Sequence, residues 1–184
     1  DDPLYNHATH VASKAEDASA LIEEVIRFFA QRRLNPCFYV SPLTSPRGFT
    51  DLLAEKGFAH YDQMMVLELT EKPFQPEDSA IKIIDVNDEM ITVWSKTFIQ
   101  AFNIPDTWML EVFRRSRVVA SHKEAGLLLG YFNEKPVGTI ALYSKNQVGG
   151  IYCLGTLRTH RGKGVASALI RKACLLYTSD AADE

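Results

Sequence analysis

The chain has 184 residues, enough for one compact domain or two small ones. A 46% hydrophobic and 23% charged composition is ordinary for a globular protein, and a net charge of −3 gives no reason to expect nucleic acid or an anionic membrane as a partner. No apolar run approaches the roughly 20 residues that span a bilayer, and no signal peptide is visible.

The cysteines point to a reducing compartment. They are three in number and lack the spacing of metal ligands, at Cys37, Cys153 and Cys174. An odd, sparse set of this kind favours free thiols in a cytoplasmic protein over a disulfide framework. The histidines His7 and His10 would point to opposite faces of a strand, so we expect no metal site.

In chain order, the first predicted elements are an edge strand at 4–12 and an amphipathic helix at 17–34. Asp17 is a candidate N-cap for the helix. The apolar face of the helix recurs at helical spacing, in Ala18, Leu21, Ile22, Val25, Phe28 and Phe29. Asn35-Pro36 ends the helix, because proline disfavours helix in the residue before it.

Two further strands and a short helix complete the first half. Residues 37–40 and 58–69 are apolar enough to predict strands, and residues 49–56 predict a helix. Gly57 is placed to take the left-handed position after that helix. The acidic, proline-containing residues 73–79 indicate a linker.

The second half predicts an α+β pattern in the order β-α-α-β-β-β-α. We expect a strand at 81–86, helices at 88–103 and 106–117, strands at 126–132, 137–144 and 148–157, and a helix from Gly164 to Ala173 or beyond. The connections between the last three strands are short, which implies antiparallel neighbours. Trp94, Phe98 and Phe102 recur at helical spacing and are interpreted as core.

The residues with the clearest chemical signal are 151–173. An apolar strand ends at Leu157, and a loop holding Arg161, Gly162, Lys163 and Gly164 leads directly into a helix. The first turn of a helix has free N–H groups and a positive dipole end, and glycines let an anion approach the backbone. The run therefore predicts a site for a pyrophosphate.

Two other phosphate-binding loops fit poorly. A Walker loop requires Lys-Ser or Lys-Thr after its last glycine, and Gly164 is followed by Val165 and Ala166. A dinucleotide fingerprint requires a third glycine after a first parallel strand, whereas the preceding strands are predicted to be antiparallel hairpins.

The loop resembles that of the GNAT acyltransferase superfamily. Its motif, Gln/Arg-x-x-Gly-x-Gly/Ala, is matched by Arg161, Gly164 and Ala166, and the order of elements over 80–173 is also similar to the GNAT core. The resemblance implies a GNAT fold and acetyl-CoA, or another acyl-CoA, as co-substrate, with no metal. Arg158 stands where many relatives have proline.

The resemblance also implies the cofactor-binding residues. The backbone of Gly155, Thr156 and Leu157 would bond the pantetheine arm. The amides of the loop would hold the pyrophosphate, namely those of Arg161, Gly162, Lys163, Gly164, Val165 and Ala166.

The implied activity is transfer of an acyl group to a primary amine of a small molecule or peptide. The catalytic residues are unknown, because strand 148–157 has no carboxylate. Tyr152 and Cys153 lie on that strand and are interpreted as packing residues. His160 lies beside the phosphate loop, where it could touch a ligand, and is interpreted as a solvated loop residue. A non-catalytic acyl-CoA sensor stays open as the alternative.

The resemblance extends to the organisation of the chain. Residues 1–72 are similar to a degenerate GNAT-like module, followed by the linker 73–79 and the GNAT domain 80–173. Residues 174–184 resemble a translated sequencing adapter, so we expect a GNAT domain truncated after Ala173. Such a chain would lack a strand and helix of the core and would show no turnover.

Overall fold

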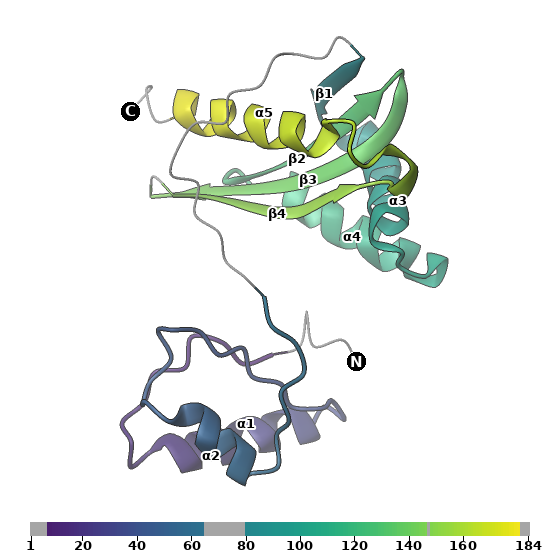
Figure 1. The fold of residues 1–184 in the computed structure, drawn as a ribbon. Coiled ribbons are helices and arrows are strands. Elements are labelled where there is room, and N and C mark those ends of the chain that lie inside the picture. The colour runs from purple at the N-terminus through teal and green to yellow at the C-terminus, as the bar shows by residue number, and fades with distance from the viewer. Residues whose placement is uncertain (1–6, 65–79, 147, 181–184) are drawn as a thin grey trace. The chain divides into compact units, whose positions relative to one another are not determined.

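The computed structural model describes residues 7–64, 80–146 and 148–180. The chain divides into two compact units, residues 1–67 and 68–184 (Figure 1).

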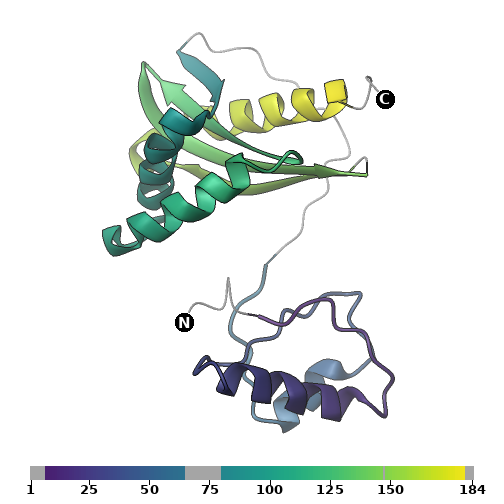
Figure 2. The same cartoon turned by 180° about the vertical axis from the view of Figure 1, so that it is seen from behind.

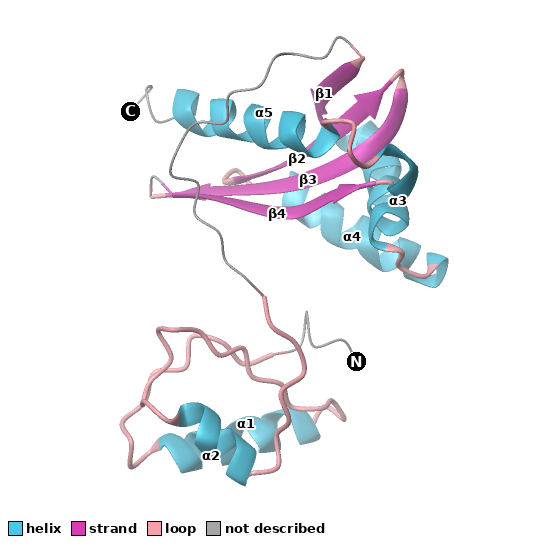
Figure 3. Cartoon of the chain, in the orientation of Figure 1, coloured by secondary structure: helices cyan, strands magenta, loops and turns pink. Residues whose placement is uncertain are grey.

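The N-terminal unit is built on two helices, α1 (Ala18–Ala30) and α2 (Phe49–Glu55), joined and flanked by loops (Figure 3). Apolar side chains from both helices and one loop residue form its core, which consists of Val11, Ala18, Ile22, Phe49 and Leu53. Both helices end in left-handed turns. Gly57 has φ +87° as predicted, and the Phe58 N–H reaches back to the Leu53 carbonyl at 3.0 Å.

Three predictions for this unit are wrong within the described residues. The strands expected at 4–12 and 37–40 are reduced to isolated bridges, Ala8 with Phe38 and Ala12 with Ser45, and residues 58–64 contain no strand. The apolar residues of these segments pack on the helices instead. The Phe38 ring lies 5.6 Å from that of Phe49 and 5.3 Å from that of Phe58. Residues 4–6 and 65–69 of the predicted strands, and the predicted linker 73–79, lie outside the described residues.

The first helix also differs from its prediction. It ends at Ala30 rather than at residue 34, because Arg33 adopts a left-handed φ of +56° and closes the turn. Asp17 precedes the helix but makes no capping hydrogen bond through its side chain. Phe28, predicted on the apolar face, is 50% exposed.

The C-terminal unit is an α+β fold around one antiparallel sheet in the order β1-β2-β3-β4. The strands are β1 (Ile81–Asp85), β2 (Ala125–Phe132), β3 (Lys135–Lys145) and β4 (Val148–Thr156). The predicted order of elements along the chain and the antiparallel pairing of the last three strands are confirmed. Asn133 and Glu134 both have positive φ, +46° and +63°, which gives the tight turn between β2 and β3.

Helices cover both faces of this sheet (Figures 1 and 2). Short 3-10 turns lead into α3 (Ile91–Phe102) and α4 (Met109–Ala120), and these two helices pack on one face around Trp94, Phe98 and Leu129. On the other face, α5 (Val165–Asp180) packs through Val165 and Leu169. The helix runs unbroken across the predicted boundary after Ala173, and the adapter origin of residues 174–184 stays a prediction.

Strand β4 is irregular where it approaches α5. Gly155 pairs with Thr139, but Tyr152 pairs with Ala141, so three steps on β4 match two on β3. Cys153 adopts φ +54° in this bulge, and the Thr139 hydroxyl donates to its carbonyl oxygen at 3.0 Å. Among the described residues β4 pairs with β3 alone, so its other edge is unpaired. A bulge on an edge strand re-aims the backbone and ends regular pairing there.

Candidate functional site

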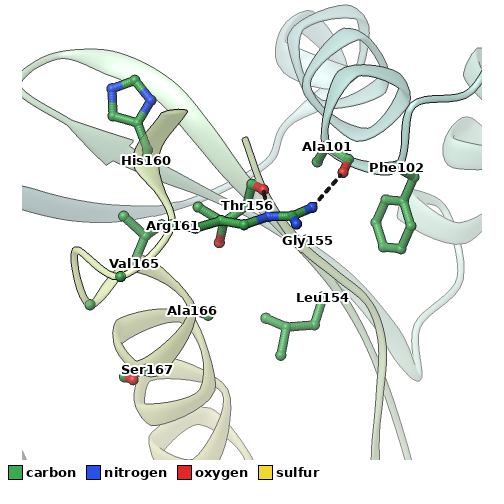
Figure 4. A pocket seen from close by; sticks show the side chains of 12 residues that line it. Ala101, Phe102, Leu154, Gly155, Thr156, His160, Arg161, Val165, Ala166 and Ser167 are labelled. Carbon is green, nitrogen blue, oxygen red and sulfur yellow. Dashed lines mark hydrogen bonds between the residues drawn. The ribbon is translucent and has the colours of Figure 1, made fainter. Parts of the chain in front are cut away.

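A cavity of about 620 Å³ lies where the end of β4, the start of α5 and the C-terminal end of α3 meet (Figure 4). Its lining consists of Ala101, Phe102, Leu154, Gly155, Thr156, His160, Arg161, Gly162, Gly164, Val165, Ala166 and Ser167. All three walls therefore come from the C-terminal unit.

The loop before α5 depends on its glycines. Gly162 and Gly164 have φ of +75° and +81°, a region that other residues adopt only under strain. The Gly164 carbonyl accepts from the Ala168 N–H at 2.9 Å and so begins the helix. In the part of the chain that the structure describes, no backbone carbonyl pairs with the N–H groups of Val165, Ala166 or Ser167. These donors belong to residues that line the cavity, and together with the helix dipole they suit an anion.

Two more glycines bring α5 close to the sheet. A Cβ atom added at Gly130 would lie 2.9 Å from Cγ1 of Val165, and one added at Gly138 would lie 2.7 Å from the same atom. Real Cβ atoms are not found so close to another carbon, so neither strand position accepts a side chain while Val165 stays in place. The glycines on β2 and β3 thus fix the height of the first turn of α5 above the sheet.

A further glycine lets α3 contact β4. A Cβ atom at Gly155 would meet Cε2 of Phe102 at 2.5 Å and Cβ of Ala101 at 3.1 Å. The sequence predicts that Phe102 belongs to the core, and this prediction is wrong. Its side chain is 45% exposed and lines the cavity, because α3 ends there, beyond the covered part of the sheet.

The Arg161 side chain extends across the cavity (Figure 4). Its Nε donates to the Thr156 carbonyl at 3.2 Å and its Nη2 donates to the Ala101 carbonyl at 3.5 Å. The Ala101 carbonyl is available because the residue four positions on, Pro105, has no N–H to complete the helical bond. The guanidinium therefore connects the ends of β4 and α3 and is not directed at the first turn of α5.

Most of the residues predicted to bind a cofactor come together here. Seven of the nine line the cavity, namely Gly155, Thr156, Arg161, Gly162, Gly164, Val165 and Ala166. Leu157 and Lys163 do not. The Leu157 N–H donates to the Val137 carbonyl at 2.8 Å, and its own carbonyl accepts from the His160 N–H at 2.8 Å. The Lys163 ammonium lies 4.9 Å from the centre of the Phe132 ring.

The sequence reasoning missed the contributions of Ala101, Phe102, Leu154 and Ser167 to the lining, and it interpreted His160 as a solvated residue. His160 is half-buried rather than fully solvated, and its ring packs edge-on against the Phe132 ring with the two centroids 5.8 Å apart. Ser167 was open to prediction, because it completes the first turn of the helix. The residues of α3 carried no local signal of their position.

Two residues of β4 behave differently from each other. Tyr152 is 58% exposed, so its interpretation as a packing residue is wrong. Its ring lies over Gly150, where an added Cβ atom would be 2.7 Å from Cε2 of the tyrosine. Cys153 does pack, against the cluster under α3 and α4, and burial raises the pKa of its thiol. A thiol kept protonated in this way is a poor nucleophile.

Neither metal ligands nor a membrane helix are found in the described ranges. Nowhere in residues 7–64, 80–146 and 148–180 do three His, Cys, Asp or Glu side chains gather in a metal-binding arrangement. None of the helices described is both long and apolar enough to cross a bilayer.

Comparison with known proteins decides the family. The family model described as "Acetyltransferase (GNAT) family" matches residues 87–180, just over half of the chain. The chain belongs to the GNAT acetyltransferase family. The matched region contains the cavity-forming loop and both helices of the opposite face. No curated protein matches the chain.

Solved structures agree on the GNAT fold. A GCN5-related N-acetyltransferase from Kribbella flavida superimposes with a TM-score of 0.66 at 16% identity, covering 91% of this chain and 66% of its own. A Pyrococcus horikoshii protein assigned to the acetyltransferases has a TM-score of 0.51 at 17% identity, covering 60% of this chain and 39% of its own. This chain thus spans about two fifths to two thirds of the length of these relatives.

Proposed function

We propose that this GNAT protein transfers an acyl group from acetyl-CoA, or another acyl-CoA, to a primary amine. The observation that carries the proposal is the first turn of α5, where N–H groups without a backbone partner among the described residues follow two left-handed glycines beside a cavity of about 620 Å³. A diphosphate is the part of acyl-CoA that such a turn would hold.

The proposed donor lies along the cavity from α5 to β4. The amides between Arg161 and Ala166 hold the diphosphate, and the backbone of Gly155 and Thr156 bonds the pantetheine arm. Leu157 was expected to share that role, but its N–H and carbonyl already bond within the protein, so its part is to fix the loop. The Thr156 carbonyl accepts from Arg161 in this structure, and its second lone pair is the acceptor that we assign to a pantetheine amide.

The proposed chemistry rests on position and backbone polarity. The amine nitrogen attacks the thioester carbonyl, the carbon–sulfur bond breaks, and the amine proton passes to water while the thiolate is protonated. Backbone N–H groups of β4 polarise the carbonyl, and the cavity aligns the two reactants. The described part of β4 has no carboxylate to act as base. Membership of an enzyme family does not favour the alternative of a non-catalytic acyl-CoA sensor.

The substrate and the organisation of the chain also remain proposals. We assign the acceptor to the class of small-molecule or peptide amines, and the N-terminal unit to a degenerate GNAT-like module. The Kribbella match supports the module, because 91% coverage of this chain extends well into residues 1–67. A cytoplasmic location and a lack of turnover by the 184 residues alone stay predictions.

Substitution of Gly164 by Asp tests the assignment of the cavity. Both the strained backbone and the added negative charge oppose a diphosphate at this turn, and like charges in contact cost several kcal/mol. We expect the affinity for acetyl-CoA, measured by titration calorimetry, to fall by more than about 100-fold.

Gly57→Asp is the matched control. Gly57 has nearly the same φ, +87° against +81° for Gly164, and no atom lies within 4 Å of its added Cβ. This variant bears the same backbone strain at a residue that does not line the cavity, so its acetyl-CoA affinity should equal that of the wild type. Unchanged affinity in Gly164→Asp would refute the assignment of this loop to the donor.

A further inference from the structure

The aromatic residues of α3 form a column that ends in the cavity. The rings of Trp94 and Phe98 stack with centroids 5.2 Å apart and planes inclined by 8°, and the Phe102 ring follows at 4.7 Å from Phe98. The indole N–H of Trp94 donates to the Leu128 carbonyl at 3.1 Å, which anchors the column to the sheet. Each ring thus supports the next along one face of the helix.

The three rings differ in exposure. Trp94 and Phe98 are buried, with only 3% and 8% of their surface exposed, whereas Phe102 is 45% exposed and lines the cavity. Its edge rests on Gly155, so close that no other residue fits at that position of β4. The ring is therefore held on two sides, by Phe98 and by β4, and presents its remaining surface to the cavity.

The position of this ring relates to the two ends of the cavity. The N–H groups of Val165, Ala166 and Ser167, which no backbone carbonyl of the described residues pairs with, form the polar end. Figure 4 shows Phe102 beyond Gly155, on the side away from Val165, whereas Leu154 packs with Val165 and Leu169 on the α5 face of the sheet. A donor whose diphosphate lies at α5 and whose arm follows β4 brings its thioester end toward the Phe102 ring.

We propose that Phe102 limits the length of the acyl group that the protein accepts. The inference rests on the proposed function, since it assumes an acyl-CoA in the cavity. An acetyl group ends before the ring, and each further methylene must displace a side chain that is packed on Phe98 and Gly155. Because the ring is held between the Phe98 ring and the backbone of Gly155, it acts as a wall rather than as a flexible surface residue.

A series of substitutions at Phe102 tests the proposal in both directions. Titration calorimetry on the full chain would compare CoA, acetyl-CoA, butyryl-CoA and hexanoyl-CoA. In the wild type we expect hexanoyl-CoA to bind about tenfold or more weakly than acetyl-CoA. Phe102→Leu and Phe102→Ala should reduce that difference step by step, and Phe102→Trp should extend the loss to butyryl-CoA.

Leu110→Ala is the control, because Leu110 is 59% exposed on α4 and does not line the cavity. Its profile of affinity against chain length should equal that of the wild type. The leucine and tryptophan variants keep the test valid should the alanine variant unfold. Tight binding of every ligand with the same profile in all Phe102 variants would overturn the wall while leaving the donor site intact. No binding of CoA or of any thioester by the wild type would instead overturn the proposed function.

Discussion

The two units of the chain build their cores in different ways. The N-terminal unit, residues 1–67, has one small apolar cluster held between two helices and loops. The C-terminal unit has a sheet with a separate apolar cluster on each face, so every central strand contributes side chains to both. A sheet covered on both faces gives the rigidity that a shaped cavity needs, and the cavity is indeed lined by that unit alone.

The largest expected effect separates the stabilities of the two units. Ile22 and Leu129 are both fully buried, at 0% exposure, one in each unit. Truncation to alanine removes core volume and should cost about 2–5 kcal/mol at either site. We expect Ile22→Ala to lower the protection of α1 and α2 in hydrogen exchange and Leu129→Ala to lower that of the sheet. Equal loss of protection in both units from either variant would show that they unfold together.

A smaller effect compares an arginine in each unit. Arg161 bonds the carbonyls of Thr156 and Ala101, and Arg32 donates to the Phe28 carbonyl at 2.9 Å while its guanidinium covers the Phe28 ring. Since the Arg161 donors bind backbone carbonyls, a glutamine, which also donates hydrogen bonds, should replace the arginine with little loss of CoA affinity. We expect Arg161→Met to weaken CoA binding about three- to tenfold and Arg161→Gln to weaken it less.

The comparison of these variants tests whether the positive charge of Arg161 contributes to CoA binding. Arg32→Gln is the control and should leave CoA affinity unchanged, because it lies in the other unit. A loss of about 100-fold in both Arg161 variants would mean that the guanidinium binds the diphosphate directly and that the carbonyl contacts are incidental.

The smallest effect concerns the thiols. Burial raises the pKa of both Cys37 and Cys153, and Cys153 also packs in the cluster under α3 and α4. Since the folded state holds this proton more tightly than the unfolded chain, the contribution of Cys153 to stability is full below the unfolded-state pKa. It is lost as pH rises through the higher folded-state value. Mass spectrometry should find Cys153 alkylated by iodoacetamide more slowly than Cys37 at pH 8, and equal rates would contradict its packing.

Much of the sheet and part of the cavity were open to prediction from local patterns. The turn at Asn133-Glu134 marks where β2 ends and β3 begins, and the glycines of the loop before α5 predict an anion site. The failures lie where a partner decides. Residues 58–64, the described part of the strand predicted at 58–69, have no neighbouring strand to pair with in the described part of the N-terminal unit. The helical spacing of Phe102 gives its face but not the point at which α3 leaves the covered part of the sheet.

The glycines beneath α5 restrict which substitutions homologous proteins can accept. Any larger residue at Gly130 or Gly138 would collide with Val165, and lifting the helix would move the amides of the residues that line the cavity. A lineage that gains a side chain at either strand position must therefore shorten residue 165 or retune its cavity. We expect these three positions to vary as a correlated set among homologues, although they are far apart in the sequence. A substitution at one of these interior positions would in this way change the ligand affinity of the cavity, although none of the side chains introduced there would need to touch the ligand.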